Sequence, residues 1–163
     1  MMDEPINFHS EGKMKRIFFI LVSLLLFAGQ TFAAEGMIST PSDSSVKETA
    51  NRLEQILTNK GMTVFKRVKH SEAAAKVDIE MRDTELIIFG NPKVGSPHMQ
   101  CQQSVAIDLP QKALIWEDTN GATWISYNDP RYVEKRHNIV GCEETISKIE
   151  KALAGIAKAA STK

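Results

Sequence analysis

The chain has 163 residues, and its 20 Lys and Arg side chains balance 20 Asp and Glu side chains, so it carries no formal net charge. This balance lacks the basic excess of a nucleic-acid-binding protein, and no basic run marks a membrane-surface contact. A partner must therefore be recognised by local shape and chemistry rather than by bulk charge.

Residues 1–33 have the pattern of a secretory signal peptide. Lys15 and Arg16 precede a short apolar run over 17–28, and the segment ends in the small-x-small site 31–33. The apolar run is shorter than the roughly 20 residues that span a bilayer, so we expect cleavage and no lasting membrane anchor. The sequence thus predicts an exported protein, either periplasmic or secreted.

The chain start and the domain boundary follow from this segment. Acidic residues precede Met14, which is unusual ahead of a basic signal start, so we interpret Met14 as the true start. Residues 34–163 remain after cleavage and are long enough for a single domain with its own core.

The first predicted elements are a strand over 37–40 and a helix over 46–60. Ser45 and Glu48 form a capping box at the helix start, and Gly61 stops the helix. Apolar residues recur at helical spacing between them, which predicts a helix with one apolar face.

A strand over 62–69 and a short helical turn over 71–77 come next. Residues 86–89 are apolar on both sides and predict a central buried strand. Residues 90–96 are expected to form a loop, and Pro97 is expected to begin a short helix.

A hairpin is predicted over 113–127, because Asn120-Gly121 between two β-rich runs is typical of a two-residue type I′ turn. That turn would pair Trp116 with Ile125, and Leu114 with Tyr127. We expect these four side chains to form the face that meets the helices.

Two helices complete the chain. Asp129 and Pro130 cap a short helix that reaches about His137. A long amphipathic helix follows, with apolar side chains at Ile146, Ile149, Leu153, Ile156 and Ala160. The predicted fold class is α+β, an antiparallel sheet of about four to five strands with two main helices on one face.

Several segments, in this order, resemble Domain of Unknown Function family 302. They are Gly90–Gln100 (GNPKVGSPHMQ), Asp108-Leu109-Pro110, Lys112 with Trp116-Glu117-Asp118, and Tyr127-Asn128-Asp129-Pro130 followed by Arg136-His137. The resemblance covers roughly residues 35–140. It implies a TATA-binding-protein-like fold in the order β-α-β4-α and a tendency to form homodimers, but no agreed activity. In the family pattern, leucine is usual where this chain has His98, and cysteines are not expected at 101 and 142.

Cys101 and Cys142 are the only cysteines. In an oxidising compartment they suggest a structural disulfide, although inert thiols or functional thiols remain open. The alternative is a soft-metal site for zinc or copper, with His98 and Cys101 one helical turn apart and His137 and Cys142 as further ligands. Nothing in the sequence requires a cofactor.

Residues 90–96 (GNPKVGS) resemble a phosphate-binding loop but lack the Lys-Ser/Thr pair after the second glycine. They either hold a small anion or only shape a turn. We take this loop and the segment 127–137 as the candidate ligand contacts, with seven residues: Asn91, Lys93, Gly95, Ser96, Tyr127, Arg136 and His137.

The leading interpretation is an exported, non-enzymatic module that dimerises and binds a small ligand or a protein partner. The first alternative is the redox or soft-metal protein. The second alternative is a hydrolase built on a carboxylate–histidine pair, which requires His70 or His137 to meet Asp108 or Glu117.

Overall fold

The computed structural model describes residues 34–163, so the predicted signal segment lies outside the described residues. The elements follow in this order: β1 (Met37–Ser42), α2 (Val46–Asn59), β2 (Thr63–Lys69), α3 (His70–Ala75), β3 (Thr84–Gly90), α4 (Pro92–Cys101), η1 (Gln103–Ile107), β4 (Gln111–Glu117), β5 (Thr123–Asn128), α5 (Pro130–Arg136) and α6 (Glu143–Ser161). Apart from the short helices, this is the predicted order of strand, helix, four strands and helix.

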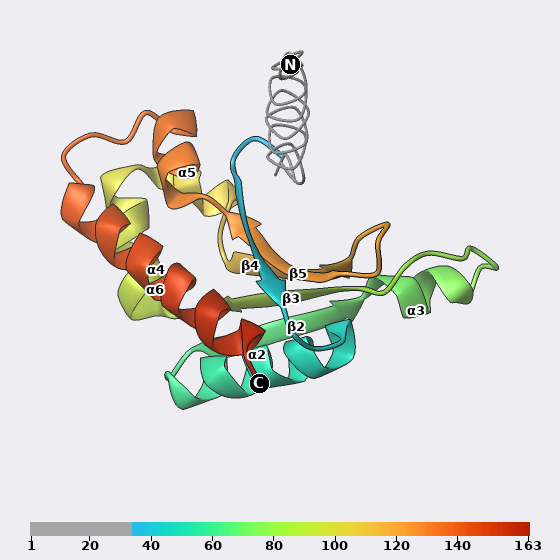
Figure 1. The fold of residues 1–163 in the computed structure, drawn as a ribbon. Helices are drawn as coiled ribbons and strands as arrows, with labels where there is room; N and C mark the ends of the chain where they lie inside the picture. Colours follow the sequence, from blue (N-terminus) through green and yellow to red (C-terminus); the bar gives the residue numbers. More distant parts are fainter. Residues whose placement is uncertain (1–33) are drawn as a thin grey trace, which may run out of the picture. The chain divides into compact units, whose positions relative to one another are not determined.

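The five strands form one sheet in the order β1-β5-β4-β3-β2, and every neighbouring pair is antiparallel. The two long helices, α2 and α6, lie side by side on one face of this sheet (Figure 1). The predicted α+β class is therefore confirmed, and the main core lies between the sheet and these two helices.

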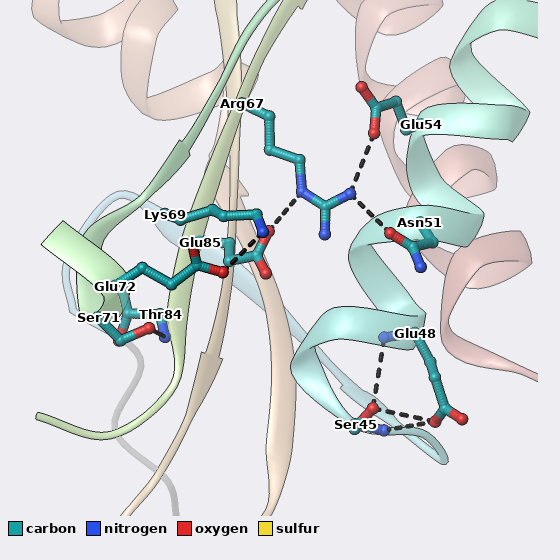
Figure 2. A network of polar contacts seen from close by, with 10 residues as sticks. All are labelled: Ser45, Glu48, Asn51, Glu54, Arg67, Lys69, Ser71, Glu72, Thr84 and Glu85. Carbon is teal, nitrogen blue, oxygen red and sulfur yellow. Dashed lines mark hydrogen bonds and ion pairs between the residues drawn. The ribbon is translucent and has the colours of Figure 1, made fainter. Parts of the chain in front are cut away.

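The capping box predicted for α2 is present. The Glu48 amide donates to Ser45 Oγ at 3.3 Å, and the Glu48 carboxylate accepts from the Ser45 amide at 3.2 Å (Figure 2). These bonds satisfy amides that the first helical turn leaves free. They fix the start of a helix whose apolar face is buried at Val46, Ala50, Leu53 and Leu57.

The apolar face of α6 is also as predicted, since Ile146, Ile149, Leu153, Ile156 and Ala160 are all buried. Asp129 caps α5 as expected by accepting from the Arg131 amide at 2.8 Å. Both helices therefore begin and pack where local sequence pattern places them.

The predicted hairpin register is wrong by one residue. Trp116 pairs with Trp124 and Leu114 pairs with Ser126. The Gly121 amide donates to the Asp118 carbonyl and Gly121 has φ +79°, so the turn is a three-residue loop with glycine in the left-handed region. The extra loop residue turns Leu114 and Trp116 to the face away from the helices, whereas Ile125 and Tyr127 remain on the helix side.

The prediction that Pro97 begins a helix is also wrong. The helix α4 begins at Pro92, and Asn91 caps it by accepting from the Lys93 amide at 2.9 Å. Residues expected to form a loop are therefore helical, and Pro97 lies inside the helix. A helix interior tolerates this proline because the carbonyl that loses its bond belongs to Lys93, which is exposed to water.

The strand β3 differs from its prediction as well. It lies between β4 and β2, so β4 is the central strand. Its burial alternates: Ile87 and Phe89 are buried against the helices, whereas Leu86 and Ile88 are only half-buried on the opposite face. A run that is apolar on both sides thus marks an interior strand with one helix-covered face.

Candidate ligand-binding site

An apolar cavity of about 330 Å³ lies where the end of β3 meets α4, α6 and the segment before β4. Its walls include Phe65, Phe89, Met99, Leu109, Leu153 and Ile156. None of the described residues that line it is an Asp, Glu, Lys or Arg. The cavity therefore offers apolar surface without any permanently charged group.

A β-bulge and two glycines keep this cavity open. The pairing of β2 with β3 shifts at Phe65, a residue that lines the cavity and is 54% exposed. A Cβ added to Gly90 would lie 3.4 Å from the Phe65 ring. A Cβ on Gly95 would meet only Leu109, at 3.9 Å, so any larger side chain there would extend into the cavity.

Among residues 34–163, His98 is the one titratable side chain in the cavity wall. It is only 2% exposed, and neither ring nitrogen has a hydrogen-bond partner in the described part of the chain. Burial lowers the pKa of His98, and the nearby charge of His137 lowers it further. The ring is therefore neutral at neutral pH, with one N–H donor and one nitrogen acceptor unpaired.

A second, much smaller space of about 10 Å³ lies behind His98. Its wall includes Asp108 and Asn128, and it shares His98 and Gln111 with the large cavity. His98 and Gln111 are thus the polar side chains that border both spaces. Asn91 and Ser96 are the other polar side chains in the described wall of the large cavity, and the rest of that wall is apolar.

Beside this wall, three side chains form a hydrogen-bonded array. His137 Nδ1 lies 2.8 Å from Ser104 Oγ, and His137 Nε2 lies 2.7 Å from Asp108 Oδ2. Arg136 donates to the other Asp108 oxygen at 2.9 Å. The structure therefore unites the predicted pair of His137 and Asp108 and adds Ser104, for which the sequence carried no local signal.

Cys101 and Cys142 form a disulfide with a Cα–Cα distance of 6.2 Å. The bridge joins the end of α4, a wall of the cavity, to the residue before α6, another wall. Because both sulfurs are bonded to each other, neither is a thiolate that can bind metal. No group of three or more His, Cys, Asp or Glu residues in the described range is arranged to hold a metal ion.

The seven candidate ligand contacts fall into separate places. Asn91, Gly95 and Ser96 line the cavity, whereas Lys93 is exposed outside it. The Lys93, Val94 and Gly95 amides already bond to Asn91, so they are not free for an anion.

The remaining candidates lie elsewhere. Tyr127 belongs to the main core, where burial raises the pKa of its hydroxyl. Arg136 and His137 belong to the array with Asp108. The predicted partners His70 and Glu117 are not part of this array. Sequence reasoning missed Phe65 and Gln111 as wall residues, because only the sheet register brings them to α4.

Comparison with known proteins identifies the family of this chain. The family model "Domain of unknown function DUF302" matches residues 38–156, and the chain belongs to this family. A crystal structure of an uncharacterized conserved protein DUF302 from Bacillus stearothermophilus has the same fold, with a TM-score of 0.70 and 22% identity. The match covers 78% of this chain and 99% of that chain.

Two curated relatives are channels. Fluoride-specific ion channel FluC 1 of Brucella suis biovar 1 (strain 1330) is 40% identical over 104 residues, which cover 64% of this chain and 41% of the channel. FluC 2 of Brucella melitensis biotype 1 matches equally, over 38% of its length. The chain thus spans about two fifths of the channels that it matches. Across 34–163, no helix is long and apolar enough to cross a membrane.

Proposed function

We propose that this domain binds a small, largely apolar molecule in the cavity between β3, α4 and α6. The observation that carries the proposal is the cavity itself, about 330 Å³, whose described walls hold no Asp, Glu, Lys or Arg and only a few polar side chains. Ligand sites typically have volumes of roughly 300–1,000 Å³ and this same mixture of apolar walls and few polar groups. The cavity falls at the small end of that range.

The test is a fluorescence titration of the domain 34–163 with 2-methylnaphthalene, an apolar probe of suitable size. We expect saturable binding to the wild type and none to Gly95→Leu, because the new side chain fills the cavity. Gly155→Leu is the matched control, since a side chain there meets only open space on α6. Saturable binding that Gly95→Leu leaves unchanged would place the probe elsewhere and contradict the proposal.

We also propose that the protein works outside the cytoplasm and as a homodimer. The signal-type sequence of residues 1–33 and the disulfide support export, since disulfides persist in oxidising compartments. The family resemblance supports the dimer. Native mass spectrometry of the exported fraction tests both: the expected mass is twice that of a chain cleaved after Ala33, and a full-length monomer would contradict both.

A second candidate function is ester hydrolysis at Ser104, favoured by the bond between Ser104 Oγ and His137 Nδ1. In that reaction Ser104 would attack the ester carbonyl, pass its proton to His137 and release the alcohol, and water would then free the acyl group. This candidate ranks second because the same bonds fasten η1 to the end of α5. A fluorophosphonate probe should modify Ser104 in the wild type but not in His137→Gln, and an unlabelled Ser104 excludes this candidate.

We do not propose fluoride conduction for this domain on the basis of its similarity to the channels. The chain covers 41% of the first channel's length, and the proposed binding rests on the cavity of this domain alone.

A further inference from the structure

The sheet face that turns away from α2 and α6, which we call the outer face, is apolar along its middle. Both long helices lie on the same side of the sheet (Figure 1), and the outer face lies outside both core clusters. Strand pairing places six half-buried apolar side chains on it: Val68, Leu86, Ile88, Leu114, Trp116 and Trp124. A contiguous apolar patch of this kind is typical of a contact with another protein.

The two ends of the outer face differ in chemistry. At one end, Lys66 and Lys112 flank Ile88 in the strand register. At the other end, Trp116 pairs with Trp124, and both indole N–H groups already donate to side chains of this chain. The outer face is thus basic at one end and offers aromatic ring surface at the other.

A second apolar surface is the segment 77–81 between α3 and β3, which we call the arm. Figure 1 shows the chain after α3 extending past the end of the sheet before it returns as β3. The acidic Asp78 and Glu80 alternate with three apolar side chains. These are 65%, 58% and 43% exposed at Val77, Ile79 and Met81. The arm therefore presents both apolar and acidic groups to water.

Hydrogen bonds hold the arm at both ends. The Ile79 amide donates to the Ala74 carbonyl at 3.0 Å, and Arg82 Nε donates to the Glu117 carbonyl at 3.0 Å. A segment that is already held in place loses less conformational freedom when a partner covers it.

The size of the outer face shows that the arm is needed for a stable contact. The face measures roughly 24 by 20 Å, since its five strands lie about 4.8 Å apart and residues rise about 3.3 Å each. A stable protein pair buries about 800 Å² on each partner. The flat face provides roughly 480 Å², so a second contact must supply part of the remainder.

We propose that the outer face is the dimer interface, and that each copy of the chain lays its arm over the lysine end of the other copy's outer face. The acidic groups of the arm complement Lys66, and its apolar side chains extend the apolar patch. This inference rests on the proposed homodimer and adds the surface through which it forms.

Symmetry fixes which ends meet. The arm joins β3 beside Thr84, which pairs with Trp116, so it leaves from the tryptophan end. A two-fold axis across the strands lays this end over the partner's lysine end and brings Lys112 over the partner's Trp116, a cation–π contact. An axis along the strands would instead set Lys112, on the central strand, against the partner's Lys112.

A charge reversal tests the contact between the arm and Lys66. Sedimentation equilibrium at low salt gives the dimer dissociation constant of the processed protein from the exported fraction. Lys66→Glu should raise this constant about tenfold, because it sets like charges together at two symmetric places. Lys66→Glu/Glu80→Lys should restore most of the affinity. Lys151→Glu is the matched control, since Lys151 is exposed on α6, on the other side of the sheet.

A second variant tests the apolar part of the arm. Ile79→Ser should raise the dissociation constant at least about tenfold, because the side chain is buried twice in a symmetric dimer. Ile79 is exposed in the single chain, so the fold does not depend on it. Val140→Ser is the matched control, since Val140 is 85% exposed in the loop before α6. Circular dichroism shows that each variant is folded.

The outcomes separate this inference from the proposed homodimer. If the wild type is a monomer at every concentration, the proposed homodimer fails and the interface fails with it. If the wild type is a dimer that neither Lys66→Glu nor Ile79→Ser weakens, the homodimer stands but its interface lies elsewhere. If Glu80→Lys does not rescue Lys66→Glu, the arm does not meet the lysine end and the inference is wrong.

Discussion

Gly95 leaves room in the cavity at a cost to the helix that carries it. It lies inside α4, and its amide bonds to the Asn91 carbonyl at 2.9 Å. A glycine inside a helix is less stable than alanine by roughly 0.5–1 kcal/mol, because the unfolded chain has more freedom to lose. The chain thus keeps a locally unfavourable residue at the position where any larger side chain would fill the cavity.

We therefore predict that Gly95→Ala raises the free energy of unfolding by about 0.5–1 kcal/mol. The added Cβ would lie 3.9 Å from Leu109, an ordinary contact that causes no clash. Urea denaturation measures the change. A loss of stability would show that the wall around Gly95 is tighter than the structure describes.

The burial of His98 leads to a second prediction, which concerns how the stability of the fold depends on pH. Its pKa is lowered from 6.5 in the folded chain, so below about pH 6.5 the unfolded chain takes up a proton that the native chain does not. Native stability should therefore fall as the pH drops through this range, by at most about 1.4 kcal/mol per pH unit, until the folded ring also protonates. Urea denaturation from neutral pH downward should show this slope in the wild type and a smaller slope in His98→Leu. Equal slopes would contradict it.

At the scale of elements, the Cys101–Cys142 disulfide holds two walls of the cavity together. It closes a loop of 41 residues, and a crosslink of that length stabilises by about 4 kcal/mol in the chain-entropy account. We predict that the double variant Cys101→Ser/Cys142→Ser loses about 4 kcal/mol of unfolding free energy and binds 2-methylnaphthalene more weakly. A denaturant midpoint that reductant does not change in the wild type would argue against this role.

The Arg67–Glu85 pair joins the edge of the sheet to α2. The Arg67 guanidinium bonds to Glu85 on the neighbouring strand and reaches Asn51 at 2.7 Å and Glu54 at 3.1 Å on the helix (Figure 2). The bond to Glu85 holds the pKa of Arg67 above its ordinary value. Glu85 is 6% exposed, and Arg67 is the cation that pairs with its buried carboxylate.

We predict that Arg67→Met destabilises the fold by about 3 kcal/mol, because it leaves a buried carboxylate unpaired. The double variant Arg67→Met/Glu85→Leu should recover most of that loss, since it removes both charges together. A double-mutant cycle from thermal unfolding measures the coupling. Strictly additive losses would show that the two side chains act independently.

In the hairpin, local sequence predicted the position of the turn but not the register of the two strands. Asn120-Gly121 correctly predicted a turn. The register depended on Asp118, which accepts from the Asn120 and Ala122 amides and from Trp124 Nε1. These bonds, the one from Trp124 first, lower the pKa of Asp118. They favour the longer loop, and only the folded hairpin brings Trp124 to Asp118.

For the two long helices, periodic patterns in the sequence were sufficient to predict their positions. The capping box and apolar spacing placed α2 and α6, because a helix buries a face that can be read along the chain. The site was harder to predict. Its walls come from six elements, namely β2, β3, α4, η1, β4 and α6. Phe65 and Gln111 meet α4 only through strand pairing. Ser104 and Asp108 meet His137 across about thirty residues, a distance that local pattern does not bridge.

At the scale of the whole molecule, ligand binding and folding are linked. A ligand that binds only the native state stabilises it by about 2.7 kcal/mol at 100 times its dissociation constant. We predict that 2-methylnaphthalene raises the thermal midpoint of the wild type accordingly and leaves that of Gly95→Leu unchanged. A rise of equal size in both would mean that binding occurs outside the cavity.

The bulge at Phe65 has a further consequence, for the solubility of the sheet. Both β1 and β2 are edge strands, and an open edge is a template for pairing with strands of other chains. The bulge interrupts the regular edge of β2 beside the exposed Lys66, and β1 carries Pro41, which has no amide to donate. The irregular strand that opens the cavity thus also discourages aggregation through the sheet edge.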